Sequence, residues 1–126
     1  MLLTLLGEAL LRSGTTLGQP EFEEARGALE RAVSERPDYA SSQLTMGKLY
    51  LMEGRLNEAI THLEAARQLN PGNTAIYSNL ATAYRKQGNL PKAQDVLSML
   101  SKLNLEQAEK IRDASGDRKA SYAGPR

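Results

Sequence analysis

The sequence predicts an all-α fold in which one helical hairpin is repeated along the chain. The first observation behind this prediction is the composition, which is dominated by Ala, Leu, Glu, Gln, Arg and Lys, all of which favour helix. The second is an internal repeat: Tyr50 and Tyr84 are 34 positions apart (84 − 50), as are Gly54 and Gly88. A fixed period of this length is the signature of a solenoid, in which each unit packs on its neighbours.

The same offset of 34 links apolar and small positions through most of the chain. In the unit Ala40–Asn73, the side chains of Met46, Leu49 and Tyr50 share one stripe of a first helix, since they are spaced by three and one residues. Positions related by the offset are Ala25, Ala59 and Ala93; Leu29, Leu63 and Leu97; and Ala32 and Ala66. Each unit is therefore expected to contain two amphipathic helices.

Turn residues mark the expected helix ends. A glycine separates the two helices of a unit, and Pro71 with the glycine after it closes the second unit. Asp38 and Asn73 are placed to cap the first helices of their units, and Asn89 to cap the last second helix. Small residues then allow the paired helices to approach closely, because Gly47 is expected to face Ala59. We expect Tyr50 and Tyr84 to fill the core around these contacts.

Composition also limits the classes of function. A chain of 126 residues forms one domain with a modest core, and its net charge of +1 argues against a nucleic-acid partner. The absence of Cys excludes disulfides and thiolate metal sites. No apolar run is long enough to span a membrane, and the N-terminal segment lacks a basic leader and contains Glu8. We therefore expect a cytoplasmic protein, with the periplasm left open.

The run from Met46 to Pro71 reads M-G-x-x-Y-x-x-x-G-x-x-x-E-A-x-x-x-L-x-x-A-x-x-x-N-P. This pattern resembles the tetratricopeptide repeat, whose units carry Leu-Gly, Tyr, Gly, Ala, Leu or an aromatic residue, Ala and Pro at these steps. The resemblance implies a right-handed superhelix, an α-solenoid, of about three helix-turn-helix units plus a C-terminal capping helix. The expected domain is residues 1–114, with units at 1–39, 40–73 and 74–107.

The two ends of the array fit the pattern less closely. In the first unit, Leu6-Gly7, Leu10 and Gly14 match only if about six extra residues, near Thr15–Pro20, lengthen the internal turn. The alternative is that Leu2–Ser13 is not a true repeat helix.

After the third unit, residues 105–114 have an apolar face of Leu105, Ala108 and Ile111, which suits a capping helix. Because Leu105 replaces the usual proline, the last repeat helix could instead run straight into the cap. Residues 115–126 are expected to be a disordered tail.

Arrays of this family, as the resemblance implies, are protein-binding scaffolds whose first helices line a concave groove for a peptide or partner helix. The apolar side chains among the expected groove residues indicate a binding surface, and the basic ones suit an acidic partner. Asn79 occupies a position that often hydrogen-bonds the main chain of a ligand. The groove residues carried over from the family are Leu44, Thr45, Lys48, Leu51, Met52, Ser78, Asn79, Thr82, Arg85 and Lys86.

No catalytic, cofactor-binding or metal-binding residues are expected. His62 is the only histidine, on the second helix of its unit, and we expect it at the surface or at the core boundary. The glycines follow the repeat and form no phosphate-binding loop. The alternative function is self-association as a homodimer, because the segment Met1–Leu11 is strongly apolar. That apolar segment also fits a piece of a longer array or of a multidomain protein.

Overall fold

The computed structural model describes residues 2–12 and 19–115, which form an all-α helical repeat solenoid. Within these residues there are helices and no strands, as the sequence predicts. The helices are α1 (Leu2–Arg12), α2 (Pro20–Glu35), α3 (Ala40–Met52), α4 (Leu56–Leu69), α5 (Thr74–Gln87) and α6 (Leu90–Ser115).

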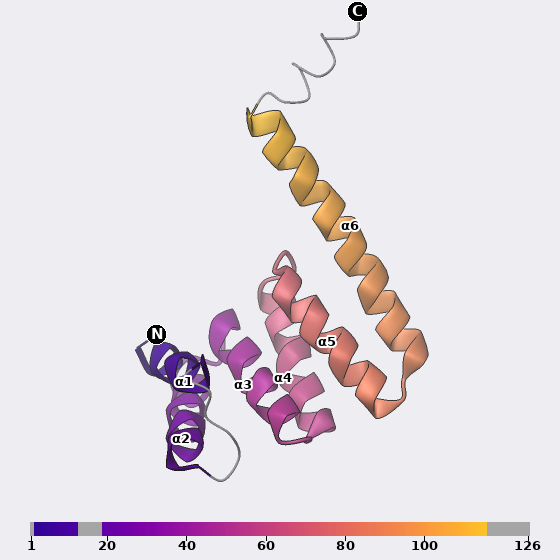
Figure 1. The fold of residues 1–126 in the computed structure, drawn as a ribbon. Helices are drawn as coiled ribbons and strands as arrows, with labels where there is room; N and C mark the ends of the chain where they lie inside the picture. The colour runs from indigo at the N-terminus through magenta and orange to yellow at the C-terminus, as the bar shows by residue number, and fades with distance from the viewer. Residues whose placement is uncertain (1, 13–18, 116–126) are drawn as a thin grey trace, which may run out of the picture.

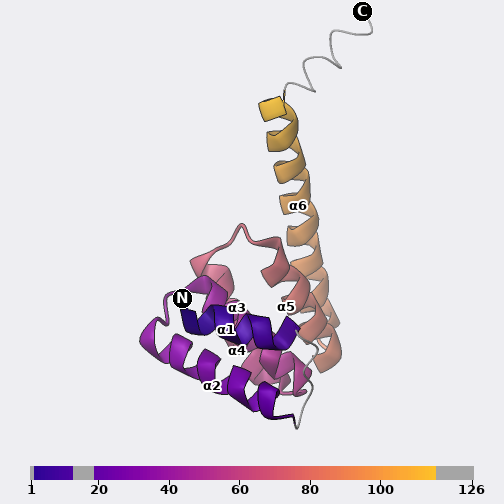
Figure 2. The same cartoon turned by 60° about the vertical axis from the view of Figure 1, so that its left-hand side comes forward.

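Consecutive helices pair into the hairpins α1–α2, α3–α4 and α5–α6, which stack side by side (Figure 1). We call α1, α3 and α5 the A helices and α2, α4 and α6 the B helices. The A helix α3 lies at the centre of the stack, since it contacts α1, α2, α4 and α5 (Figure 2). As a result every residue from 42 to 47 is buried, although Ser42, Gln43 and Thr45 are polar.

Glycines set the close approach of the two helices in a hairpin. A Cβ atom added at Gly47 would lie 2.6 Å from Cγ of Leu63. A Cβ atom added at Gly7 would lie at the same distance, 2.6 Å, from Cγ of Leu29. The leucines are 34 residues apart (63 − 29) but the glycines 40 (47 − 7), so the first hairpin has six extra residues between its contacts. The Gly7–Leu29 contact thus matches the Gly47–Leu63 contact, which supports a repeat helix at Leu2–Arg12; the insertion expected near Thr15–Pro20 stays a prediction, and most of it lies outside the described part of the chain.

The glycine after each of the two later A helices adopts a left-handed backbone conformation. The φ angle is +76° at Gly54 and +87° at Gly88. The amide of the residue after each glycine then caps the preceding helix. The N–H of Arg55 donates to the carbonyl of Tyr50 (2.9 Å), and that of Asn89 donates to the carbonyl of Tyr84 (2.9 Å). This C-capping geometry requires φ values that glycine adopts without strain, which explains the repeated Tyr-x-x-x-Gly spacing.

Two of the three expected N-caps are confirmed. The side chain of Asn73 accepts a hydrogen bond from the N–H of Ala75 (3.0 Å), and that of Asn89 accepts from the N–H of Lys92 (3.3 Å). The expectation for Asp38 is wrong: α3 begins one residue later, with Tyr39 at the cap position and no side-chain bond to the helix. The Asp38 carboxylate is bound by the guanidinium of Arg36 instead.

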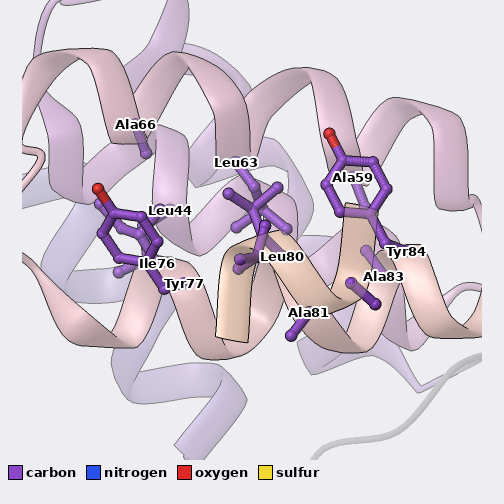
Figure 3. Close-up of a cluster of buried hydrophobic side chains, with 12 residues drawn as sticks. Leu44, Ala59, Leu63, Ala66, Ile76, Tyr77, Leu80, Ala81, Ala83 and Tyr84 are labelled. Carbon is purple, nitrogen blue, oxygen red and sulfur yellow. The ribbon is translucent and has the colours of Figure 1, made fainter. Parts of the chain in front are cut away.

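Among the described residues, two clusters of buried side chains make up the core. The larger one joins α3, α4, α5 and α6; in it Tyr77 and Tyr84 stand on either side of Leu63 and Leu80 (Figure 3). The smaller one joins α2 to α3 and consists of Phe22, Leu29, Met46 and Leu49. Tyr50 is half-buried and packs against both clusters, so the expected core role of the tyrosines is confirmed.

α6 is one continuous helix from Leu90 to Ser115, longer than either of the other B helices. The expected capping segment 105–114 is therefore the end of α6 and not a separate helix, and its residues are exposed. The physical reason is that after Pro91, in the first turn, no proline or glycine interrupts the helix. The disordered tail is expected to begin at Ser115, but Ser115 is the last residue of α6; residues 116–126 lie outside the described part of the chain.

Candidate functional site

The expected groove residues come from equivalent positions of two A helices. Adding 34 to a position on α3 gives its equivalent on α5, so Leu44 corresponds to Ser78 and Thr45 to Asn79. Their exposures differ, because among the described residues α3 has an A helix on each side and α5 has one only on its N-terminal side. We call the accessible members the A-helix face; they are Lys48, Leu51, Met52, Ser78, Asn79, Thr82, Arg85 and Lys86.

Leu44 and Thr45 do not belong to this face, because both are buried. Leu44 is 8% exposed and packs into the larger core cluster with α4 and α5. Thr45 is 1% exposed, and its hydroxyl donates to the carboxylate of Glu8 on α1 (2.9 Å). One turn away, the hydroxyls of Thr4 and Ser42 are 2.5 Å apart and both buried. The contact between α1 and α3 is thus polar, and it covers positions that the repeat pattern places in the groove.

The polar residues of α5 are partly engaged with their own helix. The amide nitrogen of Asn79 donates to the carbonyl of Ala75 (2.8 Å), and the hydroxyl of Thr82 donates to that of Ser78 (3.1 Å). The side-chain oxygen of Asn79 has no hydrogen bond to any described residue. Asn79 is half-buried, so its oxygen is an acceptor held in a fixed orientation beside exposed Ser78.

Three exposed cations belong to the A-helix face. They are Lys48, Arg85 and Lys86, and none of them forms an ion pair with a described residue. By contrast, several arginines on the B helices and in the turns bind carboxylates. These pairs are Arg26 with Glu53, Arg55 with Glu58, and Arg67 with Glu64. The positive charge of the A-helix face is therefore available to an acidic group from outside.

The apolar part of the face is smaller than the sequence suggests. Leu51 is half-buried against the larger core cluster. Met52, at the end of α3, is 43% exposed. Methionine adapts its shape to different neighbours, so this side chain adds an apolar contact to a face whose charged members are Lys48, Arg85 and Lys86.

A family model described as tetratricopeptide repeat matches residues 17–64 and 50–114 of the chain. The chain belongs to the tetratricopeptide repeat family. This confirms the resemblance carried by the Met-Gly, Tyr, Gly and Ala positions.

Relatives and solved structures agree with this assignment to the tetratricopeptide repeat family. The tetratricopeptide repeat domain-containing protein PYG7, chloroplastic, of Arabidopsis thaliana is 31% identical over 99 residues, which cover 77% of this chain and 33% of the relative. The TPR repeat-containing protein YpiA of Bacillus subtilis (strain 168) is 33% identical over 88 residues, covering 70% and 19%. Anaphase-promoting complex subunit 3 of Schizosaccharomyces pombe is 24% identical over 84 residues, covering 67% and 13%. The chain thus spans about a third or less of these relatives.

The fold is also that of a solved structure. The crystal structure of MamA superposes with a TM-score of 0.74 at 23% identity, over 85% of this chain and 59% of that one. A likeness at this identity shows the fold alone. The family assignment supports a protein–protein interaction repeat module, in a family whose members are generally non-catalytic scaffolds.

His62 serves packing in this tetratricopeptide repeat unit. Its ring stacks on that of Tyr50 with centroids 5.4 Å apart, and its Nδ1 is 2.7 Å from the side-chain oxygen of Gln43. Burial lowers the pKa of His62 below its usual value, with an opposing effect from Glu58. The expected boundary position is confirmed. Within residues 2–12 and 19–115, no three His, Asp or Glu side chains gather to hold a metal ion, and no helix is long and apolar enough to cross a membrane.

Proposed function

We propose that the chain is a non-catalytic binding module whose A-helix face takes an acidic segment of a partner protein, as an extended peptide or as a helix. The observation that supports this proposal is the set of three exposed cations, Lys48, Arg85 and Lys86, without ion pairs among the described residues. Charge-assisted hydrogen bonds to carboxylates are among the stronger polar contacts in recognition. Met52 adds an apolar contact, and the side-chain oxygen of Asn79 can accept from a main-chain N–H.

The test uses a fluorescein-labelled peptide rich in Asp and Glu, with a free C-terminal carboxylate, and fluorescence anisotropy as the readout. A second peptide with Asn and Gln at the same positions measures the share of binding that depends on charge. We expect the acidic peptide to bind and its affinity to fall with rising salt, because exposed charges are screened.

The variant for this test reverses charge on the A-helix face, as Arg85→Glu with Lys86→Glu. It is expected to weaken binding of the acidic peptide by at least about tenfold, or about 1.4 kcal/mol. Arg31→Glu with Lys102→Glu is the matched control, since it changes net charge equally at exposed positions on α2 and α6. Equal weakening in both variants would reject the A-helix face as the site. Asn79→Ala should weaken binding further, because it removes the side-chain oxygen that accepts from a main-chain N–H of the peptide.

A second candidate function is self-association. It is favoured by apolar side chains exposed at both ends of the array: Leu5 is 58% and Leu6 41% exposed on α1, while Leu105 is 69% and Ile111 70% exposed on α6. Monomeric proteins rarely expose apolar side chains in such groups. The cytoplasmic location expected from the sequence stays a prediction.

A further inference from the structure

One face of α6 is exposed along its whole length. Its residues are spaced alternately by four and three, which places them in one line on a helix and matches the repeat of a coiled-coil seam. We call this line, with Leu105 beside it, the α6 seam; the line consists of Leu90, Gln94, Leu97, Ser101, Asn104, Ala108 and Ile111. All of these residues are exposed, and a helix of 26 residues is about 39 Å long.

The first half of the seam is the position where a repeat array normally continues. Leu97 is equivalent to Leu63 and Leu29, which are fully buried in the two earlier B helices. Leu97 is 39% exposed, because no A helix follows α6 among the described residues. Leu90, equivalent to the fully buried Phe22, is 60% exposed. The seam therefore has the apolar character of an interface without a described partner.

A further A helix would cover only part of this surface. The A helices of the chain have 11 to 14 residues. Where α5 packs on α4, the contacts include Tyr84 with Glu64 and Tyr77 with Arg67. The equivalent positions on α6 are 98 and 101. The part of α6 that such a helix covers would therefore stop near residue 104. Leu105 and Ile111 would remain exposed, and only a longer partner would cover them.

A second α6 running in the opposite direction matches the central part of the seam. If two copies cross at Ser101, Leu97 of each copy lies opposite Leu105 of the other, since both are four residues from the centre. Gln94 and Ala108, each seven residues from the centre, also meet, and Leu90, eleven residues from the centre, lies opposite Arg112 and next to Ile111. Ser101 is small, which allows the two helix axes to approach closely. The part of the seam from Gln94 to Ala108 is thus self-complementary about Ser101.

Charge and shape favour the same arrangement. None of the residues of the line is charged, and Arg112, which lies opposite Leu90, faces no other cation, so two seams can meet without like charges opposed. Antiparallel helices also place opposite ends of their dipoles together. The C-terminal half of α6 projects beyond α5 in both views, which leaves it accessible to a second molecule (Figures 1 and 2).

We propose that two copies of the chain associate through their α6 seams as an antiparallel pair centred on Ser101. This inference rests on the second candidate function, self-association, and specifies its surface and symmetry. An interface of this kind is isologous, so it closes at two copies and does not propagate into a chain of molecules.

Sedimentation velocity of the full 126-residue chain, from micromolar to millimolar concentration, tests the association. The expected result is a monomer–dimer equilibrium with no larger species. Leu105→Glu with Ile111→Glu should shift it to monomer, and both positions are exposed, so the monomer stays folded. Lys110→Glu, on the opposite face, is the control that keeps the dimer. A monomer throughout would overturn both this inference and self-association.

A second pair of variants tests which surface forms the dimer, independently of whether the chain dimerises. If Leu5→Glu with Leu6→Glu abolishes the dimer while Leu105→Glu with Ile111→Glu does not, self-association stands and the α6 seam is rejected. Variants of the A-helix face should leave the dimer intact.

Disulfide trapping tests the direction of the helices, because the chain has no native Cys. Ser101→Cys is expected to form a cross-linked dimer on mild oxidation. Ala108→Cys alone should not, but a mixture of Ala108→Cys with Gln94→Cys should cross-link. A parallel pair would instead cross-link Ala108→Cys with itself, and that result would reject the antiparallel arrangement.

Discussion

Gly47 lies directly against Leu63, so that a Cβ atom at this glycine would fall 2.6 Å from Cγ and 2.7 Å from Cδ2 of the leucine. The backbone carbonyl oxygen of Ala59 would lie 3.3 Å from this added Cβ atom. Leu63 is fully buried, so its side chain cannot turn outward to make room. The hairpin therefore depends on a missing methyl group, even though glycine weakens a helix by about 1 kcal/mol relative to alanine.

Gly47→Ala is expected to destabilise the chain. Overpacking of a filled core costs about 1–3 kcal/mol, which exceeds the gain in helix propensity. Urea denaturation followed by circular dichroism measures the difference. Gly27→Ala is the matched control, since nothing lies within 4 Å of a Cβ atom there, and it should stabilise the chain. A stabilised Gly47→Ala variant would contradict the close approach of α3 to α4.

Gly88→Ala is expected to lower stability by about 1 kcal/mol, because an L-residue is strained at positive φ. The φ angle of +87° supports the capping bond from Asn89 to Tyr84. Gly72→Ala is the comparison: its φ is not positive, and the nearest atom to an added Cβ is 3.9 Å away. Equal effects of the two substitutions on the melting temperature would count against the left-handed cap.

Tyr84 is expected to ionise at a higher pH than an ordinary tyrosine. Burial, together with its hydrogen bond to the carboxylate of Glu64 (2.6 Å), raises the pKa of Tyr84 to about 12. A raised pKa stabilises the folded state below the unfolded pKa of about 10, and this stability is lost as pH rises towards 12. Tyrosinate absorbance of the native protein should show one late-titrating group that Tyr84→Phe removes. If the late step remains in that variant, the assignment to Tyr84 fails.

His62 is expected to lower stability in acid. Because burial depresses its pKa below 6.5, the neutral ring is favoured in the folded state. Its contribution is present above about pH 6.5 and is lost as pH falls through the lower, folded pKa. His62→Gln, which cannot titrate, should lose less stability between about pH 7 and pH 5 than the parent chain does. A proton NMR titration of the ring gives the pKa directly, and a value above 6.5 would contradict this prediction.

The period of 34 predicts much of the fold because it reflects a packing problem that each hairpin solves in the same way. The contact of Gly47 with Leu63 has its equivalent in that of Gly7 with Leu29, which supports the insertion of about six residues that the repeat pattern offered as one of two alternatives. The end of the array follows no such rule. Whether α6 stops near residue 104 or continues depends on one missing proline, and the sequence pattern leaves both outcomes open.

The A-helix face could be predicted only in part. The repeat pattern assigns Leu44 and Ser78 to equivalent positions, but it contains no information about which neighbours surround each one. Leu44 is buried because α3 lies between two A helices, whereas Ser78 is exposed because α5 has one. The polar contact of Thr45 with Glu8 involves α1, a helix that the sequence pattern fits to the repeat only with an insertion.

The half-buried ring of Tyr50 joins two hydrophobic clusters that are otherwise distinct. We therefore expect the two clusters to lose their packing at different stages of unfolding. The first hairpin meets α3 through the smaller cluster and through polar contacts of α1, while the later hairpins share the larger one. In amide hydrogen exchange, α1 and α2 would therefore exchange before α4 and α5, and the array would melt from its N-terminal hairpin inward.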